Sequence, residues 1–355
     1  MEFLLLIKNL VLLPGIVSFF ITAIAMYPAI RLAERFNLVD DPKIRPHPAH
    51  IQKRVVPRAG GLAPFLGIFF TILIFISPAK AIIAILFALL ILLFIGLLDD
   101  KYPNLSPYFR LLSQFVAALV VVISGVGINF ITNPLGGIIN FSPAVSSVLA
   151  LIWIVWVMNM INWSKGVDGQ MPSIVTVAAI VLGLLSIKLT LLGDPNQADV
   201  AKIAFITAGA SLGLLLFNWY PARIFPGFSG STILGFMIAT LAILSGAKLA
   251  TATLVLLIPA TDFAYIFFRR IFQKKSPVWG DKGHLHHKLL RIGLTHQKIS
   301  LFYLLGSVIL GLIALSLSSS GKLFAAILVA ILLLGGIVWL NFFGDLLRRR
   351  VPDSG

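Results

Sequence analysis

The chain has 355 residues, of which 59% are hydrophobic and only 12% charged, and its mean hydropathy is +1.00. One water-soluble core could not bury so much apolar surface, so the composition excludes a soluble globular domain or a disordered chain and predicts an integral membrane protein. The absence of Cys excludes disulfides, thiolate metal sites and a Cys nucleophile.

Eleven apolar segments follow one another along the chain, and the first is interpreted as an uncleaved span rather than a signal peptide. Because the bilayer core offers no hydrogen bonds to the backbone, and no alternating β-barrel pattern is present, each segment predicts a transmembrane helix. The expected fold is an all-α integral membrane protein, a polytopic bundle of about eleven transmembrane helices in one membrane-embedded domain, 1–355. The segments are 4–30, 61–77, 79–98, 111–127, 146–162, 171–189, 201–217, 232–246, 249–268, 299–318 and 323–343.

The basic residues predict the orientation of these spans. Of the 28 Lys and Arg residues, 22 lie in alternate connections, so the net charge of +15 indicates topology rather than a nucleic-acid partner. The positive-inside rule places those connections in the cytoplasm, with the N-terminus outside and the C-terminus inside. The five cytoplasmic loops before the C-terminal segment are 31–58, 99–110, 163–170, 218–231 and 269–298.

Polar motifs gather in these loops. Pro57-Arg58-Ala59-Gly60-Gly61 combines a cation with glycines that permit close backbone approach, which suits a phosphate, although a solvated basic loop is the alternative. Asp99 and Asp100 end an apolar span, where adjacent carboxylates suit Mg²⁺ capture or proton abstraction unless they are a plain span terminus.

The next loops add amides, an aromatic ring and imidazoles. Asn159 and Asn162 share one helix face before Lys165-Gly166-Val167-Asp168-Gly169, and the glycines allow a turn that aims Asp168. Further along, Phe225 offers a ring for stacking beside a Gly/Ser turn. His284, His286 and His287 indicate a cluster that binds phosphate or handles protons at least as well as it binds a metal.

These segments, in this order, resemble the polyprenyl-phosphate N-acetylhexosamine-1-phosphate transferases of glycosyl transferase family 4. The resemblance covers about 35–295 and rests on Asp-x-Pro and Pro-Arg-x-Gly-Gly within 40–61, the Asp99-Asp100 pair, Asn-x-x-Asn with Asp168-Gly169, Pro-Ala-x-x-Phe at 221–225 and His-x-His-His at 284–287. It implies transfer of a sugar 1-phosphate from a UDP-N-acetylhexosamine to polyprenyl (undecaprenyl) phosphate, with release of UMP, at the cytoplasmic face of the cell membrane for cell-envelope polysaccharide synthesis.

By resemblance, Asp99, Asp100 and Asp168 are the catalytic candidates. Asn162 with Asp99 and Asp100 would hold Mg²⁺, or Mn²⁺ in its place. The substrate-binding candidates are Arg58, Asn159, Lys165, Phe225, His284, His286 and His287. The expected partners are the UDP-sugar, the lipid phosphate and the bilayer, and a homodimer is left open.

Two positions depart from the family pattern. Lys165 stands where the family has the first Asp of Asp-Gly-x-Asp-Gly, and Phe228 stands where it has the Asp of Phe-x-Gly-Asp-x-Gly-Ser. Phe cannot ligate a metal. An active, divergent enzyme is the leading hypothesis, and a catalytically silent lipid-phosphate-binding relative is the alternative. A lipid or sugar transporter would need intramembrane charges, and Asp262 is its only support.

Overall fold

Helices make up most of the described chain. The computed structural model describes residues 8–41, 54–102, 105–133, 136–246, 248–276 and 283–348. Within them lie the helices η1 (Lys8–Leu12), α2 (Leu13–Arg35), α3 (Leu62–Phe75), α4 (Lys80–Lys101), α5 (Pro107–Ile123), α6 (Pro143–Trp163), α7 (Gln170–Leu191), α8 (Gln197–Asn218), α9 (Gly227–Leu244), α10 (Leu249–Val255), α11 (Leu257–Phe272), α12 (Leu285–Arg291), α13 (His296–Ser316) and α14 (Ser319–Arg348). The all-α prediction is confirmed.

Two short antiparallel ribbons are the strands of this described part. Strand β1 (Val39–Asp40) pairs with β2 (Val56–Pro57), so that Val39 lies opposite Pro57. Strand β3 (Phe130–Thr132) pairs with β4 (Ile138–Asn140). Both ribbons connect helices, and Val56 and Pro57 of β2 are buried.

Eight helices of the described chain are long and apolar enough to cross a membrane, or nine if α10 and α11 form one broken span. Helices α3 and α5 are apolar but shorter, and the 14 residues of α3 extend about 21 Å, less than the ~30 Å of a bilayer core. The polytopic membrane architecture is therefore supported, while the number eleven stays a prediction.

Large apolar side chains lie on the outside of the bundle as well as inside it. Ile24, Phe94 and Phe342 are 67%, 68% and 76% exposed, whereas Leu89 is fully buried. Water would penalise so many exposed apolar groups, so this surface fits hydrocarbon surroundings. Helix α14 is mostly exposed in the same way.

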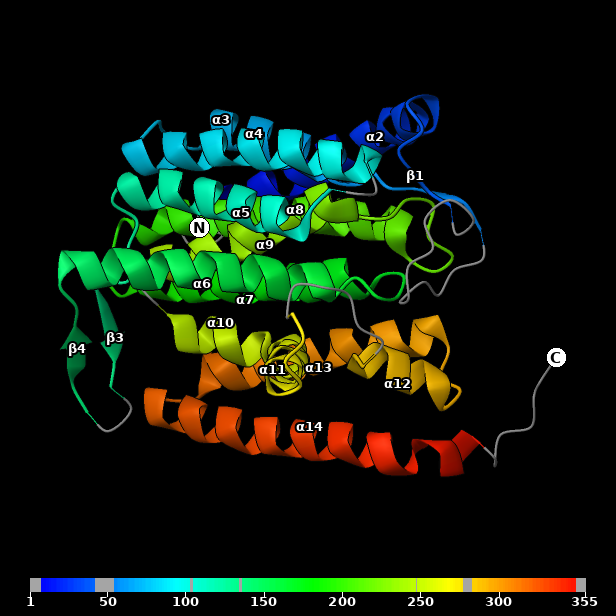
Figure 1. The fold of residues 1–355 in the computed structure, drawn as a ribbon. Coiled ribbons are helices and arrows are strands. Elements are labelled where there is room, and N and C mark those ends of the chain that lie inside the picture. The colour runs from blue at the N-terminus through cyan, green and yellow to red at the C-terminus, as the bar shows by residue number, and fades with distance from the viewer. Residues whose placement is uncertain are drawn as a thin grey trace.

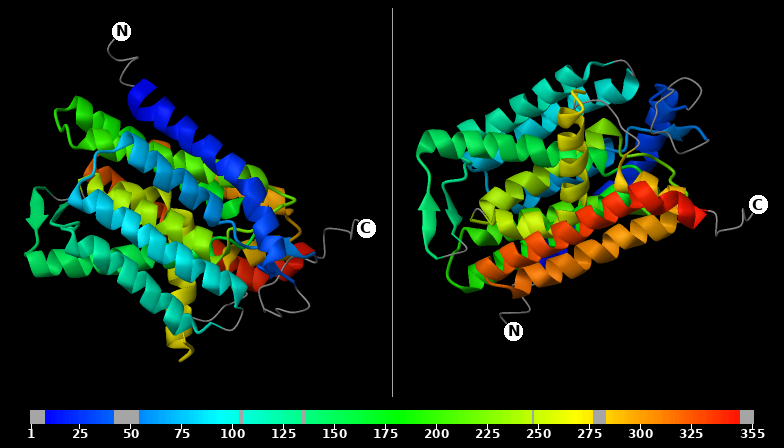
Figure 2. Two further views of the ribbon diagram at one scale, coloured as in Figure 1. Left: turned by 90° about the horizontal axis from the view of Figure 1, so that it is seen from above. Right: turned by 60° about the horizontal axis from the view of Figure 1, so that its bottom comes forward.

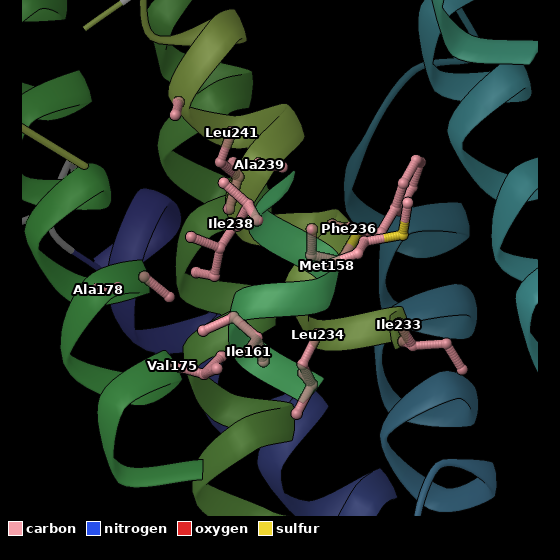
Figure 3. Close-up of a cluster of buried hydrophobic side chains, with 14 of the residues drawn as sticks. Met158, Ile161, Val175, Ala178, Ile233, Leu234, Phe236, Ile238, Ala239 and Leu241 are labelled. Atoms are coloured by element: carbon pink, nitrogen blue, oxygen red, sulfur yellow. The ribbon is translucent and has the colours of Figure 1, made fainter. Parts of the chain in front are cut away.

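The interior is built around α9, which is almost fully enclosed. It packs against α6 and α4, and more lightly against α8 and α7. Figure 3 shows the cluster where apolar side chains of α6, α7 and α9 meet, with Met158 and Phe236 among them. Because α9 is held on several sides, its N-terminus is a fixed platform.

The long helices run side by side, and the connections that carry the polar motifs meet at one end of the bundle (Figure 1). We call this the site end; it holds the β1–β2 ribbon, α12 and the loops 164–169 and 219–226. The β3–β4 ribbon lies at the opposite end, and α14 finishes at the site end (Figures 1 and 2).

The segment predicted as a continuous span over 249–268 is instead broken. Helices α10 and α11 meet at an angle of 84°, and Figure 2 shows α11 crossing the direction of its neighbours. Pro259 explains the break, because its ring lacks an N–H for the Val255 carbonyl and clashes with it, so α10 ends at Val255. The turn carries Asp262 away from the path of a straight span.

Candidate functional site

The carboxylate of Asp100 caps the N-terminus of α9. It is fully buried, and its two oxygens accept from Phe228 N at 2.8 Å, from Ser229 N at 3.3 Å and from Ser229 Oγ at 2.6 Å. The first N–H groups of a helix have no partner within the helix and carry partial positive charge, so a carboxylate is stabilised there. Gly96 allows this approach, since a Cβ on it would lie 2.4 Å from Ser229 Cα.

Arg58 links Asp100 to the β1–β2 ribbon. Its Nε lies 3.6 Å from Asp100 Oδ1, and its Nη1 lies 3.4 Å from Asp40 Oδ1. Burial alone would lower the pKa of Arg58, but the neighbouring carboxylates, Asp100 foremost, outweigh burial and raise that pKa above its usual value. Arg58 is therefore a permanent cation at the site end.

Asp99 faces a different cation. Its Oδ1 accepts from Arg110 Nε, on α5, and the Arg110 guanidinium lies 5.9 Å from the centre of the Phe228 ring. Phe228 thus packs beneath an arginine at a range typical of cation–π contacts. The two adjacent carboxylates are neutralised by two separate arginines.

Lys165 approaches the same helix terminus from the α6–α7 loop. Its Nζ donates to the Gly227 carbonyl at 2.8 Å and lies 3.3 Å from Ser231 Oγ. Burial first, and then the positive charge of Arg58, lowers the pKa of the Lys165 amine to about 7. Lys165 as a residue is half-buried, and its amine lies at the first turn of α9.

The two amides on α6 have different partners. Asn162 Oδ1 lies 2.8 Å from Ser231 Oγ, so Asn162 belongs to the surroundings of Lys165. Asn159 donates to Gln114 Oε1 at 2.6 Å and to its own helix. The structure brings Asn162, but not Asn159, to the α9 terminus.

Asp168 holds the α8–α9 loop. Its Oδ2 accepts from Ala222 N at 2.9 Å and lies 3.8 Å from Arg54 Nη2, which in turn donates to the Ala222 carbonyl. Phe225, in the same loop, is half-buried and pairs its backbone with Pro57 and Gly60. The catalytic role of Asp168 and the substrate contact of Phe225 stay predictions, since the partners observed here are within the protein.

The three histidines form one cluster with Asp262. The rings of His284 and His286 stack at 5.4 Å, and those of His286 and His287 lie 4.4 Å apart. His284 Nδ1 lies 2.9 Å from Asp262 Oδ2, and Leu285 N donates to Asp262 Oδ1 at 2.8 Å. The bend before α11 therefore makes Asp262 the anchor of the histidine segment, which corrects its interpretation as an isolated intramembrane charge and removes the support for a transporter.

The cluster touches the loop that carries Lys165. A Cβ on Gly166 would lie 2.0 Å from His286 Nε2, so only glycine fits between the two segments. Burial, followed by the neighbouring His284 and His287, lowers the pKa of His286 well below its usual value, and its Nδ1 is buried without a hydrogen-bond partner. His286 is thus a neutral ring next to the cationic loop.

The residues expected to hold Mg²⁺ do not form a site that fits it. No three His, Asp or Glu side chains in the described ranges converge as metal ligands. Asp100 and Asp99 are engaged by the α9 terminus and by arginines, and the Lys165 amine and Asn162 Oδ1 share Ser231 Oγ as a partner. An ammonium repels a divalent cation, and Phe228 supplies no ligand.

Several site residues were assigned no role from the sequence. Asp40 and Arg110 pair with the predicted residues Arg58 and Asp99, and Ser229 and Ser231 complete the α9 terminus. Two adjacent buried carboxylates need two cations, and this requirement is the signal that points to Arg110 beside Arg58. Further charged residues of the same loops, Arg45 and Lys53 before Arg58 and Asp281 and Lys282 before the histidines, lie outside the described residues.

Together, the fold and the site define a polytopic membrane protein that concentrates cations, carboxylates and imidazoles at one end of its helical bundle. The profile of glycosyl transferase family 4 matches residues 82–246. "Probable undecaprenyl-phosphate N-acetylglucosaminyl 1-phosphate transferase" of Bacillus subtilis (strain 168) is 30% identical over 297 residues, which cover 81% of this chain and 80% of that relative.

Two further relatives carry similar names. The decaprenyl-phosphate N-acetylglucosaminephosphotransferase of Mycobacterium tuberculosis (strain CDC 1551 / Oshkosh) is 30% identical over 374 residues, 95% of this chain and 89% of the relative. The undecaprenyl-phosphate alpha-N-acetylglucosaminyl 1-phosphate transferase of Escherichia coli O157:H7 is 26% identical over 309 residues, 82% of this chain and 80% of the relative. The chain belongs to glycosyl transferase family 4, which confirms the family prediction.

Proposed function

We propose that this protein transfers an N-acetylhexosamine 1-phosphate from a UDP-sugar to polyprenyl phosphate for cell-envelope polysaccharide synthesis. A lipid phosphate oxygen attacks the phosphorus that carries the sugar and forms the new diphosphate. The bond from that phosphorus to the bridging oxygen breaks, and UMP leaves with the electron pair. The names of the relatives and the basic site at one bundle end support this activity.

The observation that carries the proposal is the convergence of Arg58, Arg110 and Lys165 around the Asp99-Asp100 pair. Both substrates are phosphate anions, and phosphoryl transfer depends mostly on positioning and on stabilisation of charge. The basic side chains around the α9 terminus would bind the phosphates, and the adjoining histidines would contact the rest of the nucleotide-sugar. Asp100 orients Arg58 and the α9 terminus toward them.

The proposal includes an orientation in the membrane. We place the site end in the cytoplasm, where a UDP-sugar is made, and the β3–β4 ribbon outside. Eleven passes, with the N-terminus outside the cell and the C-terminus in the cytoplasm, agree with the distribution of Lys and Arg.

A homodimer is also proposed, and the mass of the protein in detergent tests it.

A transfer assay tests the activity. Purified protein in detergent is mixed with radiolabelled UDP-N-acetylglucosamine and polyprenyl phosphate, with and without Mg²⁺, and labelled lipid and UMP are measured. We expect transfer by the natural sequence and at least a ~100-fold loss in Asp100→Asn, because the amide cannot balance Arg58 or accept fully from the α9 terminus.

Asp194→Asn is the matched control, since Asp194 is an exposed acid at the opposite end and its variant should keep full activity. Unchanged turnover in Asp100→Asn would remove this carboxylate from the mechanism. No transfer under any of these conditions, together with retained binding of lipid phosphate, would favour the silent relative.

A further inference from the structure

We propose that the Lys165 ammonium, flanked by Arg58 and Arg110, takes the place of a divalent cation, so that the site binds the diphosphate of a nucleotide without metal. This inference rests on the proposed function for the identity of the ligand. It concerns how the charge of that ligand is balanced.

The first step of the argument is that the site carboxylates are already occupied. A carboxylate has about four lone-pair positions. Asp100 uses them for Phe228 N, for Ser229 N and Oγ, and for the ion pair with Arg58. A metal on Asp100 would have to displace the contacts that hold α9 and Arg58 in place.

The other two expected metal ligands are also engaged, each through one oxygen. Asp99 Oδ1 is held by Arg110 Nε, and Asn162 Oδ1 lies against Ser231 Oγ. Mg²⁺ usually binds through one or two carboxylates together with phosphate oxygens and water. A site that has already given its carboxylates to arginines does not meet this requirement.

The second step is the position of the Lys165 amine. An ammonium has three N–H donors, and the two contacts on α9, to the Gly227 carbonyl and to Ser231 Oγ, account for two of them. Lys165 as a residue is half-buried, and the third donor of its amine is left for a ligand at the mouth of the site. A phosphate there would meet this donor beside the guanidinium groups of Arg58 and Arg110.

The third step is the balance of charge. Three carboxylates, Asp40, Asp99 and Asp100, face three bases, Arg58, Arg110 and Lys165, so the described site is neutral before a ligand arrives. Arg58 and Arg110 are paired with carboxylates, whereas Lys165 contacts only uncharged atoms among its hydrogen-bond partners. The cation best placed to gain from an anionic ligand is therefore Lys165.

Calorimetric titration with UDP tests the proposal on the full chain in detergent, after EDTA treatment, with and without millimolar Mg²⁺. For the natural sequence we expect the dissociation constant in EDTA to stay within about threefold of the value in Mg²⁺. Lys165→Met should weaken binding in EDTA at least ~10-fold, as expected for the loss of a charged hydrogen bond to phosphate. Lys188→Met is the matched control, since Lys188 is exposed at the opposite end, and it should bind normally.

A double variant tests the exchange of cation in the opposite direction. Lys165→Asp with Phe228→Asp introduces two carboxylates and removes the ammonium. UDP should then bind at least ~10-fold more tightly with Mg²⁺ than in EDTA. Thermal unfolding and size-exclusion profiles show whether each variant is folded, and Lys165→Arg, which keeps the charge, should bind UDP within about threefold of the natural sequence.

Three results would overturn the proposal. The first is UDP affinity of the natural sequence that rises tenfold or more when Mg²⁺ is added. The others are normal UDP binding in EDTA by a folded Lys165→Met, and no UDP binding by the natural sequence with or without Mg²⁺. The transfer assay is read separately. Metal-independent UDP binding without any transfer would leave this inference standing and reject the proposed activity.

Discussion

The charge of Lys165 depends strongly on its surroundings. Its amine contacts a carbonyl and a hydroxyl, and desolvation followed by Arg58 lowers its pKa to about 7. Arg110 also lowers this pKa, while Asp100 and Asp99 act in the opposite direction. The neighbouring His286 does not share the titration, because its own pKa is lowered well below its usual value. The site can therefore lose one positive charge near neutral pH.

This titration predicts that UDP binding weakens as the pH rises. The amine is charged below its pKa and neutral above it, so affinity for the anion is high below about pH 7 and falls above it. Binding of the anion itself raises the pKa, so the loss should reach at least ~10-fold by about pH 9. Calorimetric titration with UDP between about pH 7 and pH 9 checks this prediction, and the UDP affinity of Lys165→Arg should not change over that range. A flat profile in the natural sequence would show that Lys165 does not bear the charge that binds UDP.

At the scale of elements, the site depends on how the α9 helix begins. Gly227 has φ +67°, and it lets the chain enter α9 while the Asp100 carboxylate reaches the first N–H groups. A Cβ there would lie 2.2 Å from the Arg58 carbonyl and 2.4 Å from both carboxylate oxygens of Asp100. One glycine thus joins the ribbon, α4 and α9 into a single site.

Gly227→Ala should therefore destabilise the protein strongly. The left-handed backbone alone costs about 1 to 2 kcal/mol for alanine, and the displaced Asp100 adds the loss of buried hydrogen bonds, so we expect at least ~3 kcal/mol in total. Thermal unfolding in detergent measures this cost. Gly193→Ala is the control, because Gly193 also has a positive φ, of +99°, but nothing lies within 4 Å of its Cβ. Equal effects of the two substitutions would show that the contact with Asp100 is unimportant.

The α10–α11 break is an element that the sequence pattern concealed. Hydropathy over 249–268 is continuous, so it indicates one span, and Asp262 looks like a lone charge within it. The break follows from Pro259, and only the three-dimensional turn places Asp262 beside His284, 22 positions later. A proline inside an apolar run is a signal for such a break, although it does not say which way the helix turns.

Over the whole molecule, the sequence predicts the helices and the common end of the polar loops better than it predicts which charged side chains pair. Long apolar runs predict the helices, since the bilayer leaves the backbone no other hydrogen-bonded form, and alternating charge predicts that the polar loops share one end. Figure 1 bears out that common end. Pairing of Asp99 with Arg110 and of Asp100 with Arg58 depends on helix packing, which a single sequence does not determine.

The orientation of the bundle leads to the last prediction, which single-cysteine labelling can test because the natural chain has no Cys. Ile139→Cys lies in β4, at the end opposite the site, and is exposed. Arg54→Cys and Lys274→Cys replace exposed residues in cytoplasmic loops of the proposed topology. A membrane-impermeant maleimide applied to intact cells should label Ile139→Cys alone, and after permeabilisation it should label all three.

The three positions also separate the possible errors. Labelling of Arg54→Cys and Lys274→Cys in intact cells, without labelling of Ile139→Cys, would mean that the whole bundle has the opposite orientation. The proposed UDP-sugar site would then face the outside of the cell. Labelling of Lys274→Cys but not Arg54→Cys would mean an odd number of crossings between them, and the broken α10–α11 segment would be the first place to revise. The eleven-pass arrangement requires both residues on one side, because it has an even number of crossings from the first loop to the α11–α12 connection.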